Sequence, residues 1–169
     1  MNGDPVISVL IPTYNYARYL GEAVGSVLAQ EIEQIEIVIA DDASTDDTAT
    51  VCAELASRDR RIRFHRHPVN IGMVNNWNWC LREARGRFVK YVLADDALHT
   101  GDALVKMAAV LEERPEVALV TSSRLVMDEQ SNVINWWKPL GDEDALIPAS
   151  EWVAGAVVAA AGSQFVIWG

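Results

Sequence analysis

Two pairs of adjacent aspartates are the residues most able to do chemistry in this sequence. Each pair ends an apolar run, in "VIADDAS" (38–44) and in "VLADDAL" (92–98). Two carboxylates about 4 Å apart repel by roughly 1 kcal/mol in water and by about 4 kcal/mol in a partly buried cleft. A divalent cation removes that repulsion, and Mg²⁺ or Mn²⁺ takes one or two protein carboxylates and completes its shell with water and substrate phosphates. The second pair, Asp95 and Asp96, is therefore predicted to anchor a metal-bound diphosphate.

The first pair suggests a different task. The ionised carboxylate of Asp42 can accept hydrogen bonds from an N–H edge such as that of uracil, and Tyr14 can stack on the face of the base. Two alternatives stay open. Tyr14 can equally be a core aromatic residue at the mouth of a loop, and Asp46 and Asp47, slightly further on, are read as turn and helix-cap residues.

These residues need a scaffold, and the rest of the sequence predicts an α/β fold. Short apolar runs alternate with segments in which apolar residues recur at helical spacing. This alternation predicts a Rossmann-like, mostly parallel sheet with helices on both of its faces. The strands are expected at residues 6–11, 35–40, 62–65, 88–93 and 117–121.

The predicted loops that carry polar groups all follow strands. "PTYN" (12–15) follows the first strand, and "HPVNIG" (67–72) follows the third. Ligands of open parallel sheets bind beyond the carboxyl ends of the strands, near the point where the strand order reverses. We therefore expect these two loops and both aspartate pairs to meet at one rim.

Several capping signals mark the expected helix ends. Ser44 with Asp47 fits a capping box at the start of the second helix, and Thr100 is expected to cap the fourth. Gly86 is expected to close the third helix and Pro115 to stop the fourth. After residue 123 the alternation ends, and we expect a small antiparallel hairpin with its turn at 128–132 and a last helix from about 150 to 161.

The composition limits the classes of partner. The chain has 24 acidic and 14 basic residues and a net charge of −10, which argues against a nucleic-acid binder. Five arginines lie in "RDRRIRFHR" (58–66), which is either a phosphate grip or a solvated helix end leading into a strand, and we favour the latter.

Membrane spans and disulfides are not expected. The uncharged stretch 152–169 reaches only the lower edge of a transmembrane length and contains polar residues, so it is read as a buried helix followed by a strand. Cys52 and Cys80 are read as core thiols. The N-terminus has no signal-peptide pattern, so the expected location is the cytoplasm, or the membrane periphery for a longer enzyme.

With these motifs assembled, the chain resembles the N-terminal half of family 2 glycosyltransferases, which have the GT-A fold. "PTYN", "DDASTDDT" and the later aspartate pair carry the resemblance, which covers most of residues 6–121. In that family the rim binds a nucleoside-diphosphate sugar, usually of UDP or dTDP. The resemblance implies these roles: a base pocket lined by Pro12, Thr13 and Tyr14, a hydrogen bond from the base to Asp42, a ribose or metal contact at Asp95, a Mn²⁺ or Mg²⁺ ligand at Asp96, and a nearby loop with Asn70 and Gly72.

The sequence departs from the family pattern in three places. Leu93 stands where many relatives have a further aspartate, and Trp77 stands where arginine is common. The general base of inverting members usually lies well beyond the metal motif, and the nearest later carboxylates do not match its context. We therefore expect residues 1–169 to be one nucleotide-sugar domain, truncated before the catalytic base and the acceptor part. The unmatched carboxylates are Asp142, Glu143, Asp144 and Glu151.

The predicted function is an inverting, metal-assisted glycosyltransferase that acts on a saccharide, lipid-linked or other hydroxyl acceptor. One alternative is a nucleotide-sugar-binding module without turnover. Another is a phosphoacceptor receiver domain, which needs a lysine after its fifth strand, where this chain has "VTSS", and an acidic pair after its first, where it has "PTYN". A dinucleotide-dependent oxidoreductase is disfavoured because no G-x-G-x-x-G follows the first strand.

Overall fold

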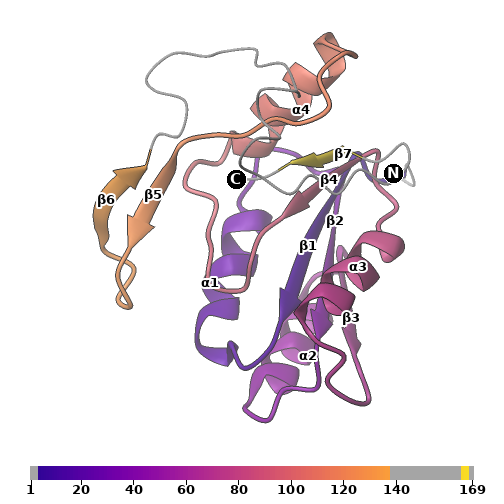
Figure 1. Cartoon of the computed structure of the whole chain (residues 1–169), viewed down its shortest axis with the longest axis vertical. Helices are drawn as coiled ribbons and strands as arrows, with labels where there is room; N and C mark the ends of the chain where they lie inside the picture. The colour runs from indigo at the N-terminus through magenta and orange to yellow at the C-terminus, as the bar shows by residue number, and fades with distance from the viewer. Residues whose placement is uncertain (1–3, 138–164, 168–169) are drawn as a thin grey trace.

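The computed structural model describes residues 4–137 and 165–167. Strands and helices alternate up to residue 113, and three further strands follow (Figure 1). In chain order the elements are β1 (Ile7–Thr13), α1 (Ala17–Leu28), β2 (Ile35–Asp41), α2 (Thr48–Arg58), β3 (Ile62–Arg66), α3 (Met73–Glu83), β4 (Phe88–Tyr91), α4 (Ala103–Glu113), β5 (Arg124–Met127), β6 (Val133–Trp137) and β7 (Phe165–Ile167).

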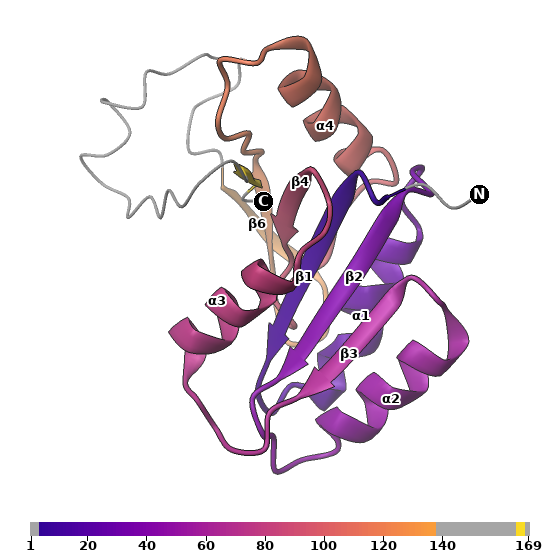
Figure 2. The ribbon, with the colours of Figure 1, turned by 90° about the vertical axis from the view of Figure 1, so that its right-hand side faces the viewer.

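The main sheet is parallel, as the alternation predicts. Its strand order is β3-β2-β1-β4-β7, so β1 lies between β2 and β4 (Figure 2). The chain moves outward from β1 to β3 and then crosses to the other side of β1 to form β4. The order therefore reverses between β1 and β4, which is where an open sheet leaves room for a ligand.

Helices cover both faces of this sheet, which confirms the predicted α/β fold. Figure 1 shows α1 and α3 on opposite sides of the strands. Alternate residues of β1 enter different apolar clusters: Val9 packs with residues of α1, α2 and α4, whereas Leu10 packs with residues of α3. All seven residues of β1 and of β2 are buried, which explains why both strands read as nearly continuous apolar runs.

The predicted strand at 117–121 is wrong. The chain between α4 and β5 forms no strand, although Val117 and Val120 pack against the larger apolar cluster. The sheet edge beside β4 is paired with β7 instead. The apolar run does face the core, but backbone pairing depends on which segment reaches the free edge.

The helix ends also differ from the capping predictions. Asp46, not Ser44, accepts a hydrogen bond from the first residue of α2, Thr48 N to Oδ1 at 3.0 Å. Thr100 Oγ1 donates to the side chain of Asp102 (2.7 Å), and α4 begins only at Ala103 without a side-chain cap.

Gly86 has a different role from the one predicted. Helix α3 ends at Glu83, and a Cβ atom on Gly86 would lie 2.5 Å from the backbone nitrogen of Ser8. The residue therefore allows a close backbone approach beside β1. Pro115 follows the end of α4 at Glu113, as predicted.

Beyond the main sheet, the hairpin prediction is confirmed by the antiparallel pairing of β5 with β6. The strand expected near the C-terminus is β7, whereas the helix expected at 150–161 lies outside the described residues. In the described part of the chain, no helix has the length and apolar character needed to cross a bilayer. Both cysteines are buried, and burial raises the pKa of each thiol to about 12.

The arginine-rich segment is the end of α2 and the strand β3, in agreement with the favoured interpretation. Most of its arginines are neutralised by neighbours within the fold. Ion pairs join Arg58 to Glu54, Arg61 to Asp59, Arg63 to Glu36 and Glu83, and Arg66 to Asp41.

Candidate active site at the carboxyl edge of the sheet

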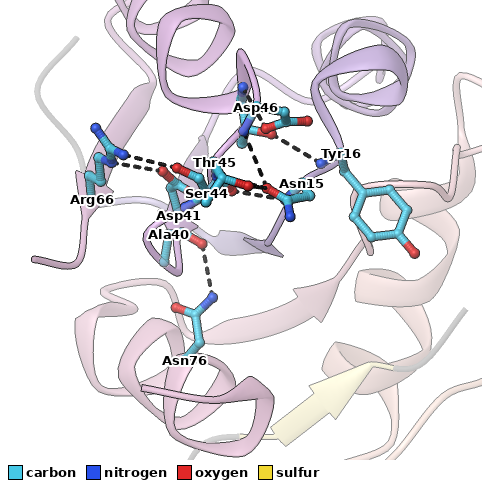
Figure 3. Close-up of polar contacts among 10 residues, drawn as sticks. Asn15, Tyr16, Ala40, Asp41, Ser44, Thr45, Asp46, Arg66 and Asn76 are labelled. Carbon is cyan, nitrogen blue, oxygen red and sulfur yellow. Dashed lines mark hydrogen bonds and ion pairs between the residues drawn. The ribbon is translucent and has the colours of Figure 1, made fainter. Parts of the chain in front are cut away.

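The loops after β1 and β2 are tied to each other by Asn15. Its backbone N–H donates to Ser44 Oγ (2.8 Å), and its side-chain oxygen accepts from Thr45 N (2.8 Å; Figure 3). Asn15 has a φ of 60°, a left-handed conformation that asparagine tolerates better than most residues. This short link fixes the two loops against each other at the rim.

Asp41, the first acid of the first pair, serves the scaffold. Its side chain is fully buried, and Oδ1 accepts hydrogen bonds from both the N–H and the hydroxyl of Ser44. Arg66 Nε lies 3.3 Å from Oδ2, and another nitrogen of the same guanidinium donates to Ser44 O (3.0 Å; Figure 3). These contacts fix the turn after β2, in which Ala43 has a φ of 59°.

Asp42, the second acid, holds the loop before α3. Ile71 N donates to Oδ1 (2.7 Å) and Gly72 N to Oδ2 (2.9 Å), and only 2% of the residue is exposed. Gly72 N also lies 3.1 Å from Asn70 Oδ1. The fold thus brings Asp42, Asn70 and Gly72 together, as the sequence predicts. The hydrogen bond from a base to Asp42 stays a prediction.

The three residues predicted to line a base pocket occupy the end of β1. Pro12 and Thr13 are buried, and Asp42 N donates to Thr13 O (3.0 Å). The buried hydroxyl oxygen of Thr13 has no hydrogen-bond partner within residues 4–137 and 165–167. Tyr14 is 44% exposed, which rules out the alternative of a core aromatic and leaves its ring accessible.

Asp95 and Asp96 lie on the other side of β1, after β4, in the wall of a cavity of about 580 Å³. A second wall comes from the start of α1, and a third comes from the β5–β6 hairpin. None of the residues predicted for the base pocket lines this cavity. The lining includes Tyr16, Tyr19, Glu22, Asp95, Asp96, Arg124, Val126, Asp128 and Trp137.

The charges around this cavity influence one another. Partial burial raises the pKa of Asp96, and the charge of Asp95 raises it further. The Asp95 carboxylate also raises the pKa of the Tyr16 hydroxyl. Lys90, on β4, is almost completely buried, and burial together with the positive charge of Arg124 lowers its pKa to about 8. Uncompensated charge is thus concentrated where the second aspartate pair lies.

This pair fits a hard divalent cation. No group of three or more histidine, cysteine, aspartate or glutamate side chains in the described residues is arranged to hold a metal. Asp95 and Asp96 offer two solvent-accessible carboxylates, the number that Mg²⁺ commonly takes from protein when phosphate oxygens complete its shell. The raised pKa of Asp96 reflects the same repulsion that a bound cation would relieve.

Comparison with known proteins identifies the family. Residues 8–151 match the family model "Glycosyl transferase family 2". The chain belongs to this family. Among curated relatives of this glycosyltransferase chain, the "Putative glycosyltransferase EpsE" of Bacillus subtilis (strain 168) is 33% identical over 130 residues, which is 76% of this chain and 46% of that protein. "Uncharacterized protein MT1568" of Mycobacterium tuberculosis (strain CDC 1551 / Oshkosh) is 35% identical over 137 residues, 81% of this chain and 41% of the relative.

Solved structures agree with that assignment and with the GT-A fold. S. aureus TarS 1–349 in complex with UDP-GlcNAc has a TM-score of 0.64 and 27% identity over 76% of this chain and 37% of that chain. The mannosyltransferase PcManGT from Pyrobaculum calidifontis, in complex with GDP-Man and Mn²⁺, has a TM-score of 0.65 and 26% identity over 73% of this chain and 37% of that chain. The family 2 chain therefore spans less than half the length of these relatives.

Four cavity or near-cavity residues are absent from the sequence-based predictions: Tyr16, Lys90, Arg124 and Trp137. Tyr16 lies two positions after Tyr14, and the "PTYN" motif points to the earlier ring. Lys90 has a usable signal, since a lysine inside the apolar run "FVKYVL" breaks the pattern of a buried strand. Arg124 and Trp137 have none, because only the hairpin's position against α1 brings them to the cavity.

Proposed function

We propose that this chain is the nucleotide-sugar domain of an inverting, metal-assisted glycosyltransferase. The observation that carries the proposal is the Asp95–Asp96 pair, which lines a cavity at the point where the strand order reverses. Membership of glycosyl transferase family 2 supports the reaction class. The sugar would pass from a nucleoside diphosphate to an acceptor hydroxyl.

The donor is proposed to lie across the end of β1. Its base would occupy the side of Asp42 and Tyr14, where the ring of Tyr14 is accessible. Its diphosphate would lie on the side of Asp95 and Asp96. UDP or dTDP is the proposed carrier; TarS with UDP-GlcNAc supports a uridine nucleotide, whereas PcManGT with GDP-Man makes a guanosine nucleotide the alternative.

In this proposal Asp95 and Asp96 hold Mn²⁺ or Mg²⁺. When bound, the cation would supply positive charge to the departing diphosphate. The acceptor oxygen would form a bond to C1 of the sugar on the face opposite the leaving group, while the bond from C1 to the phosphate oxygen breaks, which inverts the configuration. The acceptor proton would pass to a general base that we expect beyond Gly169.

A nucleotide-sugar-binding module without turnover remains the second candidate, because none of the described carboxylates is recognised as the general base. Family membership offers no support for a receiver domain. The acceptor, the cytoplasmic location and the single-domain division stay predictions.

Titration of UDP by calorimetry, with Mn²⁺ and with EDTA, tests the donor site. We expect binding that depends on Mn²⁺ and that weakens at least tenfold, or about 1.4 kcal/mol, in Asp96→Asn. Asp102→Asn is the matched control, because Asp102 lies at the start of α4 and does not line the cavity. GDP is titrated in parallel. The proposal fails if the native chain binds neither nucleotide, or if Mn²⁺ and Asp96→Asn leave the affinity unchanged.

A further inference from the structure

The β5–β6 hairpin presents a cation and an aromatic ring to the cavity of the acid pair. Arg124 and Trp137 are direct partners in the antiparallel register, and the guanidinium carbon lies 5.0 Å from the centroid of the Trp137 ring. Both side chains line the cavity together with Asp95 and Asp96. No role in donor or metal binding proposed above uses either of them.

The hairpin is held in place by α1. Arg18 Nη2 donates to Glu129 O (2.9 Å), and Ser131 Oγ donates to Glu22 Oε2 (2.7 Å). These contacts join residues more than one hundred positions apart and attach the hairpin turn to the opposite wall of the cavity. Figure 1 shows the hairpin beside α1 and separate from the main sheet. The Arg124–Trp137 pair is therefore part of a constructed wall.

The chemistry of this wall suits a saccharide ring. Trp137 is 51% exposed, so much of its indole surface remains available although Arg124 lies over the ring. A sugar offers apolar C–H groups on one face and hydroxyl groups around its edge. The indole matches the former, and Glu22 and Asp128, which also line the cavity, can accept from the latter. A free anion would be repelled by the same carboxylates.

We propose that Arg124 and Trp137 form a saccharide-binding platform, with the ring packed on Trp137 and its hydroxyl groups contacting Arg124. The sugar belongs either to the nucleotide donor or to the acceptor, and the identification of those two sources rests on the proposed function. The cavity volume, about 580 Å³, lies within the roughly 300–1,000 Å³ range of small-molecule sites.

Trp137→Ala tests the platform, with Trp136→Ala as its matched control. The neighbouring Trp136 is 59% exposed, points to the other face of β6 because strand side chains alternate, and does not line the cavity. Trp137→Phe retains a ring and should restore binding in part. Thermal unfolding of each variant verifies that the fold is kept.

Two measurements distinguish the donor from the acceptor. In the first, calorimetry with Mn²⁺ compares UDP with UDP-GlcNAc and GDP with GDP-mannose. If the platform holds the donor sugar, Trp137→Ala weakens nucleotide-sugar binding by about threefold to tenfold and leaves the plain nucleotide unchanged. In the second, saturation-transfer NMR uses methyl glycosides of glucose, N-acetylglucosamine, mannose and galactose. If the platform holds the acceptor, Trp137→Ala removes the saturation signal from the glycosides while nucleotide-sugar affinity stays the same.

The platform is overturned if Trp137→Ala matches the native chain in both measurements, or if Trp136→Ala causes the same loss. Failure of the proposed function looks different. In that case the native chain binds no nucleotide, while the glycoside measurement still decides whether the hairpin binds sugar.

Discussion

Lys90 is the largest charged side chain that the fold buries, with 1% of its surface exposed in β4. No hydrogen bond or ion pair involves its ammonium group in the described residues, and its pKa is lowered to about 8. Burying a charge without a close partner destabilises a fold. A lysine in this place therefore carries a cost in stability, as residues near functional sites often do.

Lys90→Met is expected to stabilise the chain at pH 7. Because the pKa falls from 10.5 in the unfolded chain to about 8 in the fold, the unfolded state binds more protons between these values. The cost is fully present below pH 8, on the order of 3 kcal/mol at most, and disappears as the pH rises toward 10.5. Urea unfolding at pH 7, 8, 9 and 10 should show the advantage of the methionine variant shrinking with pH. A constant difference, or one that grows with pH, would contradict this explanation.

Asp42 gives the second prediction at this scale. Asp42→Ala removes the acceptors of two backbone N–H groups, those of Ile71 and Gly72. Leaving such groups unpaired costs about 1–3 kcal/mol each, so the free energy of unfolding should fall by about 2 kcal/mol or more. Asp47→Ala is the control, because Asp47 is exposed and makes no side-chain cap to α2, and it should change stability by less than about 0.5 kcal/mol. Equal stabilities in denaturant titrations would show that Asp42 does not hold this loop.

The identity of the key acids is predictable from the sequence, but their partners are not. Asp42, Asp95 and Asp96 each follow an apolar run, and this pattern alone places them at strand ends. The contact between Asp42 and Gly72 joins residues 30 positions apart, and only the packing of the loop before α3 creates it. The charge coupling between Lys90 and Arg124 depends on the hairpin in the same way.

Secondary-structure elements follow the sequence wherever local pattern and tertiary context agree. The first four predicted strands, the alternating helices and the hairpin turn are all present. The strand expected at 117–121 is missing because an apolar run makes a strand only where a free sheet edge is available, and β7 pairs with the edge of β4. The capping box does not form because Ser44 bonds to Asp41 within its own turn.

Gly86 supplies the prediction at the scale of elements. Gly86→Ala would push a Cβ atom against the backbone of Ser8, so β1 and the segment before β4 must separate. We expect a loss of at least about 2 kcal/mol of unfolding free energy, or failure to fold. Gly21→Ala is the matched control: it lies within α1 with no atom within 4 Å of the added Cβ, and should stabilise by about 0.5–1 kcal/mol. Thermal unfolding that moves both variants in the same direction would contradict the close-approach role of Gly86.

At the scale of the whole molecule, β1 separates two groups of candidate residues. Asp42, Asn70 and Gly72 lie together on the side of β2 and β3, and the Asp95–Asp96 cavity lies on the side of β4. The strand order explains this arrangement, since β2 and β4 both pair with β1. A donor that spans β1 would use both groups, its base on one side and its diphosphate on the other.

The central claim is that Asp95 and Asp96 bind the cation that holds the diphosphate. Paramagnetic broadening of backbone amide NMR signals by Mn²⁺, in the presence of UDP, tests it most directly. We predict that the signals of Tyr16, Asp95 and Asp96 broaden, that those of Arg61 and Gly86 at the opposite edge of the sheet stay sharp, and that Asp96→Asn abolishes the effect. Broadening centred on Asp41 to Asp46, or broadening that persists unchanged in Asp96→Asn, would contradict the claim.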